Sequence, residues 1–142
     1  MKKVILSLAA LMTSGTLLHA SFSERKLDNA IASATKSGKL IAFVFYSDYA
    51  LPNCPKCVTS TDAKNKALKG AIPRSDVVVV EIEKGDKDLD KLPACVSSKG
   101  SAPRLVITDS KAEKVIATAG GDANREKAKE IRKLVEEARS GA

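Results

Sequence analysis

The sequence predicts an α/β protein built on a mixed central four-stranded sheet that is flanked by helices. Three observations support this class. Two continuous apolar runs are typical of strands buried on both faces. Helical patterns alternate with these runs, and two further strands are separated only by a tight turn. With 142 residues, 44% of them hydrophobic and 29% charged, the chain has the length and composition of one soluble domain.

The first twenty residues have the layout of a secretory signal peptide. A charged start, "MKK", precedes a short apolar run and "TSGTLLHA", which ends at Ala20. We therefore expect a signal peptide over 1–20, a single domain over 21–142, and a periplasmic or secreted protein. An uncleaved membrane anchor is the alternative, but the apolar stretch is short and interrupted by polar residues. No stable membrane insertion is expected after cleavage.

Loss of this leader changes the chemistry that the chain can support. Lys2 and Lys3 leave, which lowers the formal net charge by two, from +7 to +5, and His19, the only histidine, leaves as well. Without imidazole, Ser–His and Cys–His catalysis and histidine-ligated zinc are excluded. The remaining lysines are scattered among acidic residues without interleaved aromatic residues, so we expect a solvated surface and no nucleic-acid partner.

The helical and strand patterns follow one another along the chain. The first predicted helix begins after Ser23 and is stopped by Gly38. The β-rich run "LIAFVFY", 40–46, predicts the first strand, and "DVVVVEIE", 76–83, predicts the second. The other expected elements are a weaker helix over 58–70, a polar segment over 85–100 with one or two helical turns, strands over 103–109 and 113–120 that form a hairpin, and an amphipathic helix over 122–140 with Asp122 as its N-cap.

The segment "SDYALPNCPKCV" places Cys54 and Cys57 directly after the first predicted strand. Cys54, Pro55 and Lys56 should form the first turn of the next helix, where free backbone N–H groups and the helix dipole favour an anion. A Cys54 thiolate should be stabilised there, and the charge of Lys56 should add to the effect. Cys54 would then attack a substrate disulfide, and Cys57, one turn further and more shielded, would resolve the mixed disulfide.

The spacing of these cysteines also fits half of a metal site or a structural disulfide. Zinc and iron–sulfur clusters need four ligands, and Cys95 is the only other cysteine, so we expect no metal and no cofactor. A structural disulfide across so small a loop constrains the unfolded chain little, which weakens that interpretation without excluding it. Cys95 is expected to be a small buried apolar residue. The alternative is an extra thiol that pairs with another chain or with the Cys54–Cys57 disulfide.

Pro103 is the second signal, because it stands immediately before a predicted strand and follows the small residues Gly100, Ser101 and Ala102. One interpretation is an ordinary proline at the edge of a strand. The other is a cis peptide bond between Ala102 and Pro103, which would leave the neighbouring backbone free to pair with a substrate segment beside Cys54.

The motifs "SATKSGKLIAFVFYSDY", "CPKC" and "SAPRLVITDSKAEKVIATAGG", together with the final helix, resemble the thioredoxin superfamily over 22–140. The beginning of the domain is similar to the small secreted or periplasmic members. The resemblance implies a thioredoxin-like fold, Cys54 as nucleophile, Cys57 as resolving thiol and Pro103 as the cis-proline that gates substrate binding. It also implies a thiol–disulfide oxidoreductase that acts on protein thiols or disulfides and exchanges electrons with a further redox partner.

Some residues depart from the family's pattern. Asn53 stands where the family usually has Trp, and Val44 stands where many members have a buried acid. Asp48 is the nearest carboxylate and could replace that acid or lie in solvent. Arg104 could hold Cys54 as a thiolate, contact a substrate, or be an exposed charge at the start of a strand. These departures motivate the alternative function, a redox-inert binding or scaffold protein whose Cys54–Cys57 disulfide is structural.

Overall fold

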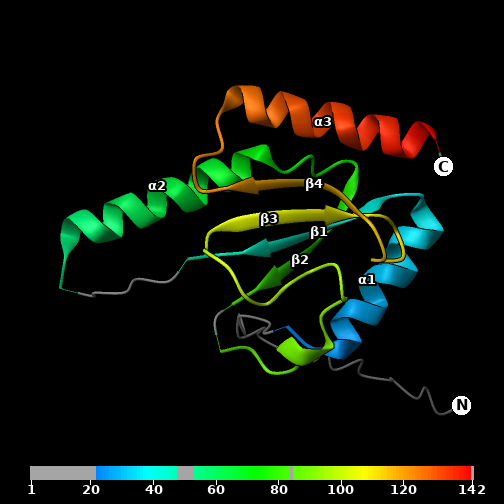
Figure 1. Cartoon of the computed structure of the whole chain (residues 1–142), viewed down its shortest axis with the longest axis horizontal. Helices are drawn as coiled ribbons and strands as arrows, with labels where there is room; N and C mark the ends of the chain where they lie inside the picture. Colours follow the sequence, from blue (N-terminus) through cyan, green and yellow to red (C-terminus); the bar gives the residue numbers. More distant parts are fainter. Residues whose placement is uncertain (1–21, 48–52, 84, 142) are drawn as a thin grey trace, which may run out of the picture.

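The computed structural model describes residues 22–47, 53–83 and 85–141, and these residues form one α/β unit. A four-stranded sheet in the order β2-β1-β3-β4 lies between helices (Figure 1). The elements in chain order are α1 (Glu24–Ser37), β1 (Leu40–Phe45), α2 (Pro55–Ala71), β2 (Val77–Ile82), the 3₁₀ turn η1 (Leu89–Lys91), β3 (Arg104–Thr108), β4 (Val115–Gly120) and α3 (Arg125–Ser140). The predicted fold class is confirmed, and the cysteine-bearing helix follows the central strand as in a thioredoxin-like fold.

Two predictions fall on parts of the chain that lie outside the described residues. One is the signal peptide over 1–20, with its boundary at residue 21, and the other is the role of Asp48. Of the helices that the structure describes, none combines the length and the apolar character needed to cross a membrane.

Helix α1 begins and ends at the residues that the sequence predicts. The Ser23 side chain caps its start by accepting a hydrogen bond from the Lys26 backbone N–H at 3.4 Å. Gly38 ends it with a φ of 65°, a left-handed conformation that a residue without a Cβ adopts at little cost. Just before the helix, Phe22 is fully buried, and its backbone N–H donates to the Asp86 carboxylate at 2.9 Å. The described chain is therefore anchored from its first residue.

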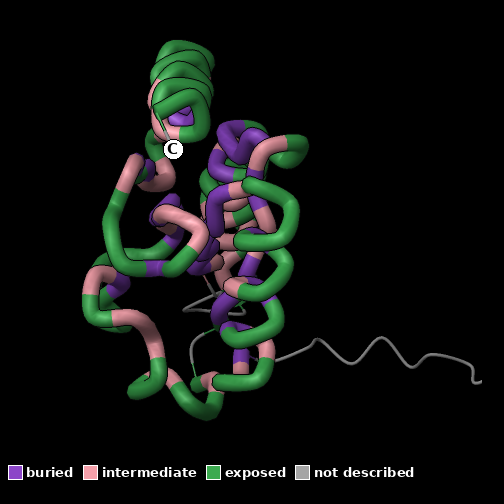
Figure 2. The backbone as a smooth tube through the Cα atoms, turned by 90° about the vertical axis from the view of Figure 1, so that its right-hand side faces the viewer, coloured by how far each residue is buried: buried purple, intermediate pink, exposed green. Residues whose placement is uncertain are grey.

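Strand β1 lies at the centre of the sheet, and all six of its residues are buried. Alternate side chains point to opposite faces, so this strand contributes to two apolar layers. The layer on the α1 side contains Phe22, Leu27, Ala30, Ala34, Ile41, Phe43, Phe45, Val80, Ile82, Val96, Val106 and Ala112. The layer on the α2–α3 side contains Leu40, Ala42, Val44, Leu68, Ala71, Ile72, Val77, Leu105, Ile107, Ala117, Ala119, Ile131 and Val135. Figure 2 shows the buried stretches gathered inside and the exposed stretches outside.

The strand pairing determines which segments meet at each end of the sheet. β1 runs parallel to β2 and antiparallel to β3, and β3 and β4 form the predicted antiparallel hairpin. Phe45, the last residue of β1, pairs with Arg104, the first residue of β3. The segment before β3, which contains Pro103, therefore arrives at the same end of the sheet from which the chain leaves β1 toward Cys54.

Helices α2 and α3 lie on the same side of the sheet (Figure 1). Leu68 and Ala71 of α2 and Ile131 and Val135 of α3 are buried against it. The expected N-cap of α3 is wrong: Asn124, and not Asp122, caps the helix, and its side chain accepts a hydrogen bond from the Lys127 N–H at 2.8 Å. Both residue types suit this position, so the sequence pattern could not distinguish them.

Candidate active site

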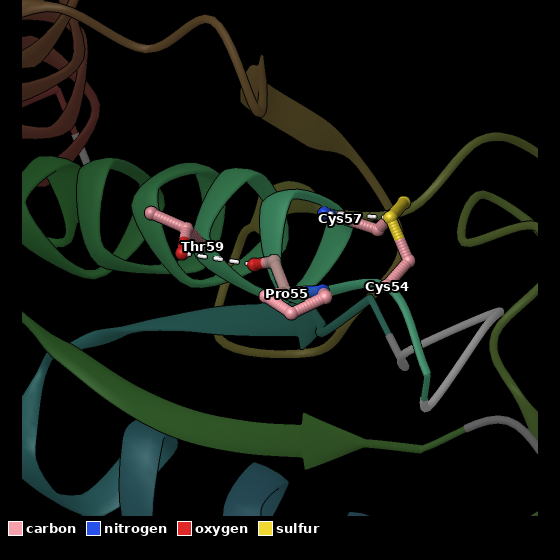
Figure 3. Close-up of a disulfide and its surroundings, with 4 residues drawn as sticks. All are labelled: Cys54, Pro55, Cys57 and Thr59. Carbon is pink, nitrogen blue, oxygen red and sulfur yellow. Dashed lines mark hydrogen bonds between the residues drawn. A yellow bond between two sulfur atoms is a disulfide. The ribbon is translucent and has the colours of Figure 1, made fainter.

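Cys54 and Cys57 form a disulfide at the start of α2 (Figure 3), with their Cα atoms 5.2 Å apart. Cys54 is the N-cap residue, with extended backbone, and Pro55 occupies the first helical position. Proline suits that position because its missing N–H would have no partner in the helix. One turn further along the helix, the Thr59 hydroxyl donates a hydrogen bond to the Pro55 carbonyl at 3.0 Å. The predicted position of the cysteine pair at a helix start is therefore confirmed.

The two sulfur atoms differ in their hydrogen bonds to the backbone. The Cys57 N–H is one of the donors that has no carbonyl partner in the first turn, and it donates to the Cys54 Sγ at 3.2 Å. The first turn contains no acidic residue, and Lys56 within it is exposed. Negative charge on the Cys54 sulfur would be stabilised by this N–H and by the positive end of the helix dipole. The two cysteines do not differ in burial class, because Cys54 and Cys57 are both half-buried. The expectation was that Cys57 would be more shielded.

Pro103 follows a cis peptide bond from Ala102, which is the geometry predicted from the sequence. Its side chain is buried, whereas Ala102 is exposed. A Cβ atom built on Gly121 would lie 3.0 Å from the Pro103 Cγ and 3.1 Å from the Lys64 Cβ. Pro103 therefore lies beside the middle of α2. Lys64 is seven positions after Cys57, which is roughly 10 Å along a helix axis.

Arg104 lies on the α1 side of the sheet, the face opposite to α2. Its guanidinium stacks on the Phe45 ring at 3.8 Å from the centroid and donates to the Ser97 carbonyl. It also lies next to Gly100, since a Cβ built there would be in ordinary contact with the guanidinium Nε at 3.4 Å. Partial burial lowers the pKa of Arg104. These contacts tie the segment before Pro103 to the sheet. Of the three roles left open for Arg104, contact with Cys54 is not among the interactions that the structure shows for the described residues.

Asn65 was not singled out from the sequence, yet it joins α2 to the end of β1. Its side-chain oxygen accepts from the Ser47 N–H, and its side-chain nitrogen donates to the Ser47 carbonyl, both at 3.1 Å. Ser47 is the last described residue before the segment that leads to Cys54. An Asn inside a helix is a poor helix former that often bonds to nearby backbone, and this was the available signal.

The end of β1 also carries a polar cluster around Tyr46. The Tyr46 hydroxyl donates to Glu81 of β2 at 3.2 Å, and the Lys69 ammonium lies over the ring at 4.9 Å from its centroid. Burial, followed by the negative charge of Glu81 and this hydrogen bond, raises the pKa of Tyr46 to about 12, while Arg74 acts in the opposite direction. Val44, where the family often has an acid, is fully buried and pairs with Glu81, which is itself exposed.

Cys95 is a free, half-buried thiol that packs against the α1-side layer. It donates to the Ala112 carbonyl at 3.3 Å, and burial raises its pKa. Ala112 lies in the turn after β3, whereas Pro103 lies before that strand. Cys95 is thus at the opposite end of the sheet from the segment that leads to Cys54, and it is half-buried where a buried residue was expected. Within the described ranges, no group of three or more His, Cys, Asp or Glu side chains could hold a metal ion.

Comparison with known proteins adds one solved structure. Neither a protein-family model nor a curated protein matches this chain. The chain is similar to a crystal structure described as a disulphide isomerase from Xylella fastidiosa Temecula1, with 20% sequence identity and a TM-score of 0.48. The similarity covers 84% of this chain and 92% of the other. The chain is an α/β domain with a mixed four-stranded sheet in the order β2-β1-β3-β4 and a Cys-Pro-Lys-Cys pair at the start of α2.

Proposed function

We propose that this protein is a thiol–disulfide oxidoreductase that exchanges disulfides with protein substrates outside the cytoplasm. The observation that carries the proposal is the hydrogen bond from the Cys57 N–H to the Cys54 sulfur at the start of α2. In the reduced protein the same N–H would face the Cys54 thiolate, and thiolates at helix starts react readily with disulfides. Cys54 is then the nucleophile and Cys57 the resolving thiol.

The exchange proceeds in two balanced steps. The Cys54 thiolate attacks one sulfur of a substrate disulfide, the substrate S–S bond breaks, and the second substrate sulfur leaves as a thiolate. Cys57 then loses its proton to solvent and attacks the Cys54 sulfur of the mixed disulfide, which releases the first substrate sulfur as a thiolate. The substrate gains two electrons and the Cys54–Cys57 pair loses two. The reverse sequence oxidises a substrate dithiol, and the potentials of the two pairs determine the direction.

The substrate's backbone is proposed to pair at Ala102, the exposed residue before Pro103. This role comes from the resemblance described above and from the position of Pro103 on the sheet end that leads to α2. A paired segment would extend along the side of α2 from the level of Lys64 toward Cys54, roughly 15 Å along the helix, or about four to five extended residues.

Single-cysteine variants of the mature protein test the proposal. Reduction of a protein disulfide should be lost in Cys54→Ser. Cys57→Ser should accumulate a mixed disulfide with its substrate, because attack still occurs but resolution does not. Cys95→Ser, which alters the thiol at the other end of the sheet, is the matched control and should retain wild-type activity. Wild-type activity no greater than that of Cys54→Ser would contradict the proposal.

A redox-inert binding or scaffold protein is the second candidate. It is favoured by the fully buried Val44 and by the exposed Asn53, which stand where related enzymes carry a proton acceptor and a Trp. The reduction potential of the Cys54–Cys57 pair separates the two candidates. An exchanging pair should lie between about −270 and −120 mV, whereas a structural disulfide should lie below about −300 mV.

The proposed location depends on the predicted signal peptide over 1–20. Expression of the full chain followed by cell fractionation should recover the protein outside the cytoplasm, and sequencing of its N-terminus should begin at Ser21. A cytoplasmic protein that retains Met1 would show that the leader interpretation is wrong.

A further inference from the structure

A groove of about 530 Å³ runs between the C-terminal half of α2 and the first half of α3. Its walls come from two helices that lie on the same side of the sheet (Figure 1). The residues that line it are Lys66, Ala67, Gly70, Ala71, Ala123, Asn124, Arg125, Ala128, Lys129 and Arg132. The set contains four cations and no acidic residue.

The four cations form one coherent basic surface. Arg125, Lys129 and Arg132 recur at the spacing that places residues on one face of a helix, and Lys66 faces them from α2. All four are exposed. Among the described residues, the ion pairs of α3 are made by Lys127, Lys133 and Arg139, and none of these pairs includes a cation of the groove. The N-terminus of α3 adds the positive end of its dipole.

Small residues give this groove an open floor. Ala67, Gly70, Ala71 and Ala128 line it without a bulky side chain, and a Cβ built on Gly70 would meet nothing within 4 Å. Gly70 follows Lys66 by one helical turn, so the open space lies directly beside a cation. A narrow extended chain could reach this floor while its charged groups meet the surrounding lysines and arginines.

We propose that this groove, which we call the basic groove (Lys66, Gly70, Arg125, Ala128, Lys129 and Arg132), docks an acidic peptide segment of the protein whose disulfide is exchanged. Identifying the occupant with the redox substrate rests on the proposed function. Lys66 is twelve positions after Cys54, roughly 18 Å along the axis of α2, so about five extended residues would join the docked segment to the reacting cysteine.

Other polyanions fit the basic groove less well. None of the lining residues is aromatic, so bases of a single-stranded nucleic acid would have nothing to stack on. The large apolar residue found exposed in the described part of the chain is Val115 on β4, and membrane-binding surfaces need apolar side chains next to their cations. A concave, small-floored, basic groove therefore favours an acidic protein segment.

Binding of a fluorescent hexaglutamate peptide, which contains no cysteine, tests the docking step independently of redox chemistry. Anisotropy should show saturable binding by the oxidised mature protein, weakened by salt. Lys129→Glu/Arg132→Glu should lower the affinity by about tenfold or more, because it reverses two charges in the groove. The matched control, Lys87→Glu/Lys111→Glu, makes the same change in net charge at exposed positions outside the groove and should change the affinity by less than about twofold.

A second variant tests the shape of the groove without altering charge. Gly70→Leu places a side chain in open space and leaves all four cations in place, so the protein should fold and lose peptide binding. The basic groove would be overturned as the site by an equal loss of affinity in Lys129→Glu/Arg132→Glu and in the control Lys87→Glu/Lys111→Glu. Unchanged affinity in Gly70→Leu would overturn it as well. Tighter binding of an oligothymidylate of equal charge, or of phosphatidylglycerol vesicles, that is lost in Lys129→Glu/Arg132→Glu would overturn the acidic peptide as its occupant.

Exchange assays connect docking to the reaction. A disulfide peptide that carries an acidic segment should show a lower KM than the same peptide with a neutral segment, and Lys129→Glu/Arg132→Glu should abolish this difference without changing kcat. If hexaglutamate binds but the wild-type protein does not exchange disulfides, the proposed function is wrong, whereas acidic-peptide binding in the basic groove is supported. If exchange occurs at equal KM for both peptides, the docking of substrate fails and the proposed function stands.

Discussion

Replacing Asn65 by alanine removes the two hydrogen bonds that join α2 to Ser47 at the end of β1, each 3.1 Å long. A net contribution of about 0.5–1.5 kcal/mol for each bond gives about 1–3 kcal/mol for the pair. Ser47 and Asn65 are only half-buried, so water can partly satisfy the freed N–H and carbonyl groups, which favours the lower half of this range. Alanine is also the better helix former, by about 0.5 kcal/mol. We therefore expect a loss of about 0.5–1.5 kcal/mol in the free energy of unfolding.

Urea unfolding of the mature protein measures this loss as a lower midpoint at an unchanged m-value. Thr59→Ala is the matched control on the same helix, since it removes one exposed side-chain bond to the Pro55 carbonyl and should change stability by less than about 0.5 kcal/mol. Hydrogen exchange should locate the effect, because the Ser47 amide loses its partner only in Asn65→Ala. Equal stabilities for Asn65→Ala and Thr59→Ala, with unchanged exchange at Ser47, would refute the reasoning.

Three further predictions concern other parts of the fold. An absorbance titration should show that Tyr46 ionises near pH 12, and Glu81→Gln should lower that pKa without restoring the ordinary value of 10, because burial is the largest cause. The neutral phenol stabilises the fold fully below pH 10, and this contribution should be lost as pH rises through 12. Gly70→Ala should raise the unfolding free energy by about 0.5–1 kcal/mol, whereas Gly38→Ala, at a φ of 65°, should lower it by about 1 kcal/mol. Phe22→Ala should cost about 3–5 kcal/mol in the same urea assay, and a cost below about 1 kcal/mol would mean that residue 22 is not part of the core.

The elements that the sequence predicts well are those whose signals are local. Ser23 and Gly38 delimit α1 because a capping side chain and a left-handed backbone depend only on neighbouring residues. The run 40–46 was predicted as a strand buried on both faces, and β1 is buried throughout, because an uninterrupted apolar run has no polar side to present to water. The start of α2 at Cys54 and Pro55 follows from the same local rules.

Features that depend on pairing between distant segments could not be predicted. The sequence left three roles open for Arg104, and its register opposite Phe45 directs it to the α1 side of the sheet. A one-residue shift in register would have reversed that direction, and nothing in the sequence fixes the register to that accuracy. The bonds of Asn65 to Ser47 likewise join residues eighteen positions apart, and the choice of Asn124 over Asp122 as N-cap depends on where the chain leaves β4.

The complete burial of β1 has a consequence for how the protein unfolds. Each apolar layer has this strand as part of its wall, so losing either layer would leave one whole side of β1 in water. Melting should therefore be cooperative, with α1 and the α2–α3 side lost in one transition as expected for a small domain. A protease that acts on partly open molecules would find no intermediate in which the disulfide-bearing helix is released while the rest of the described chain stays folded.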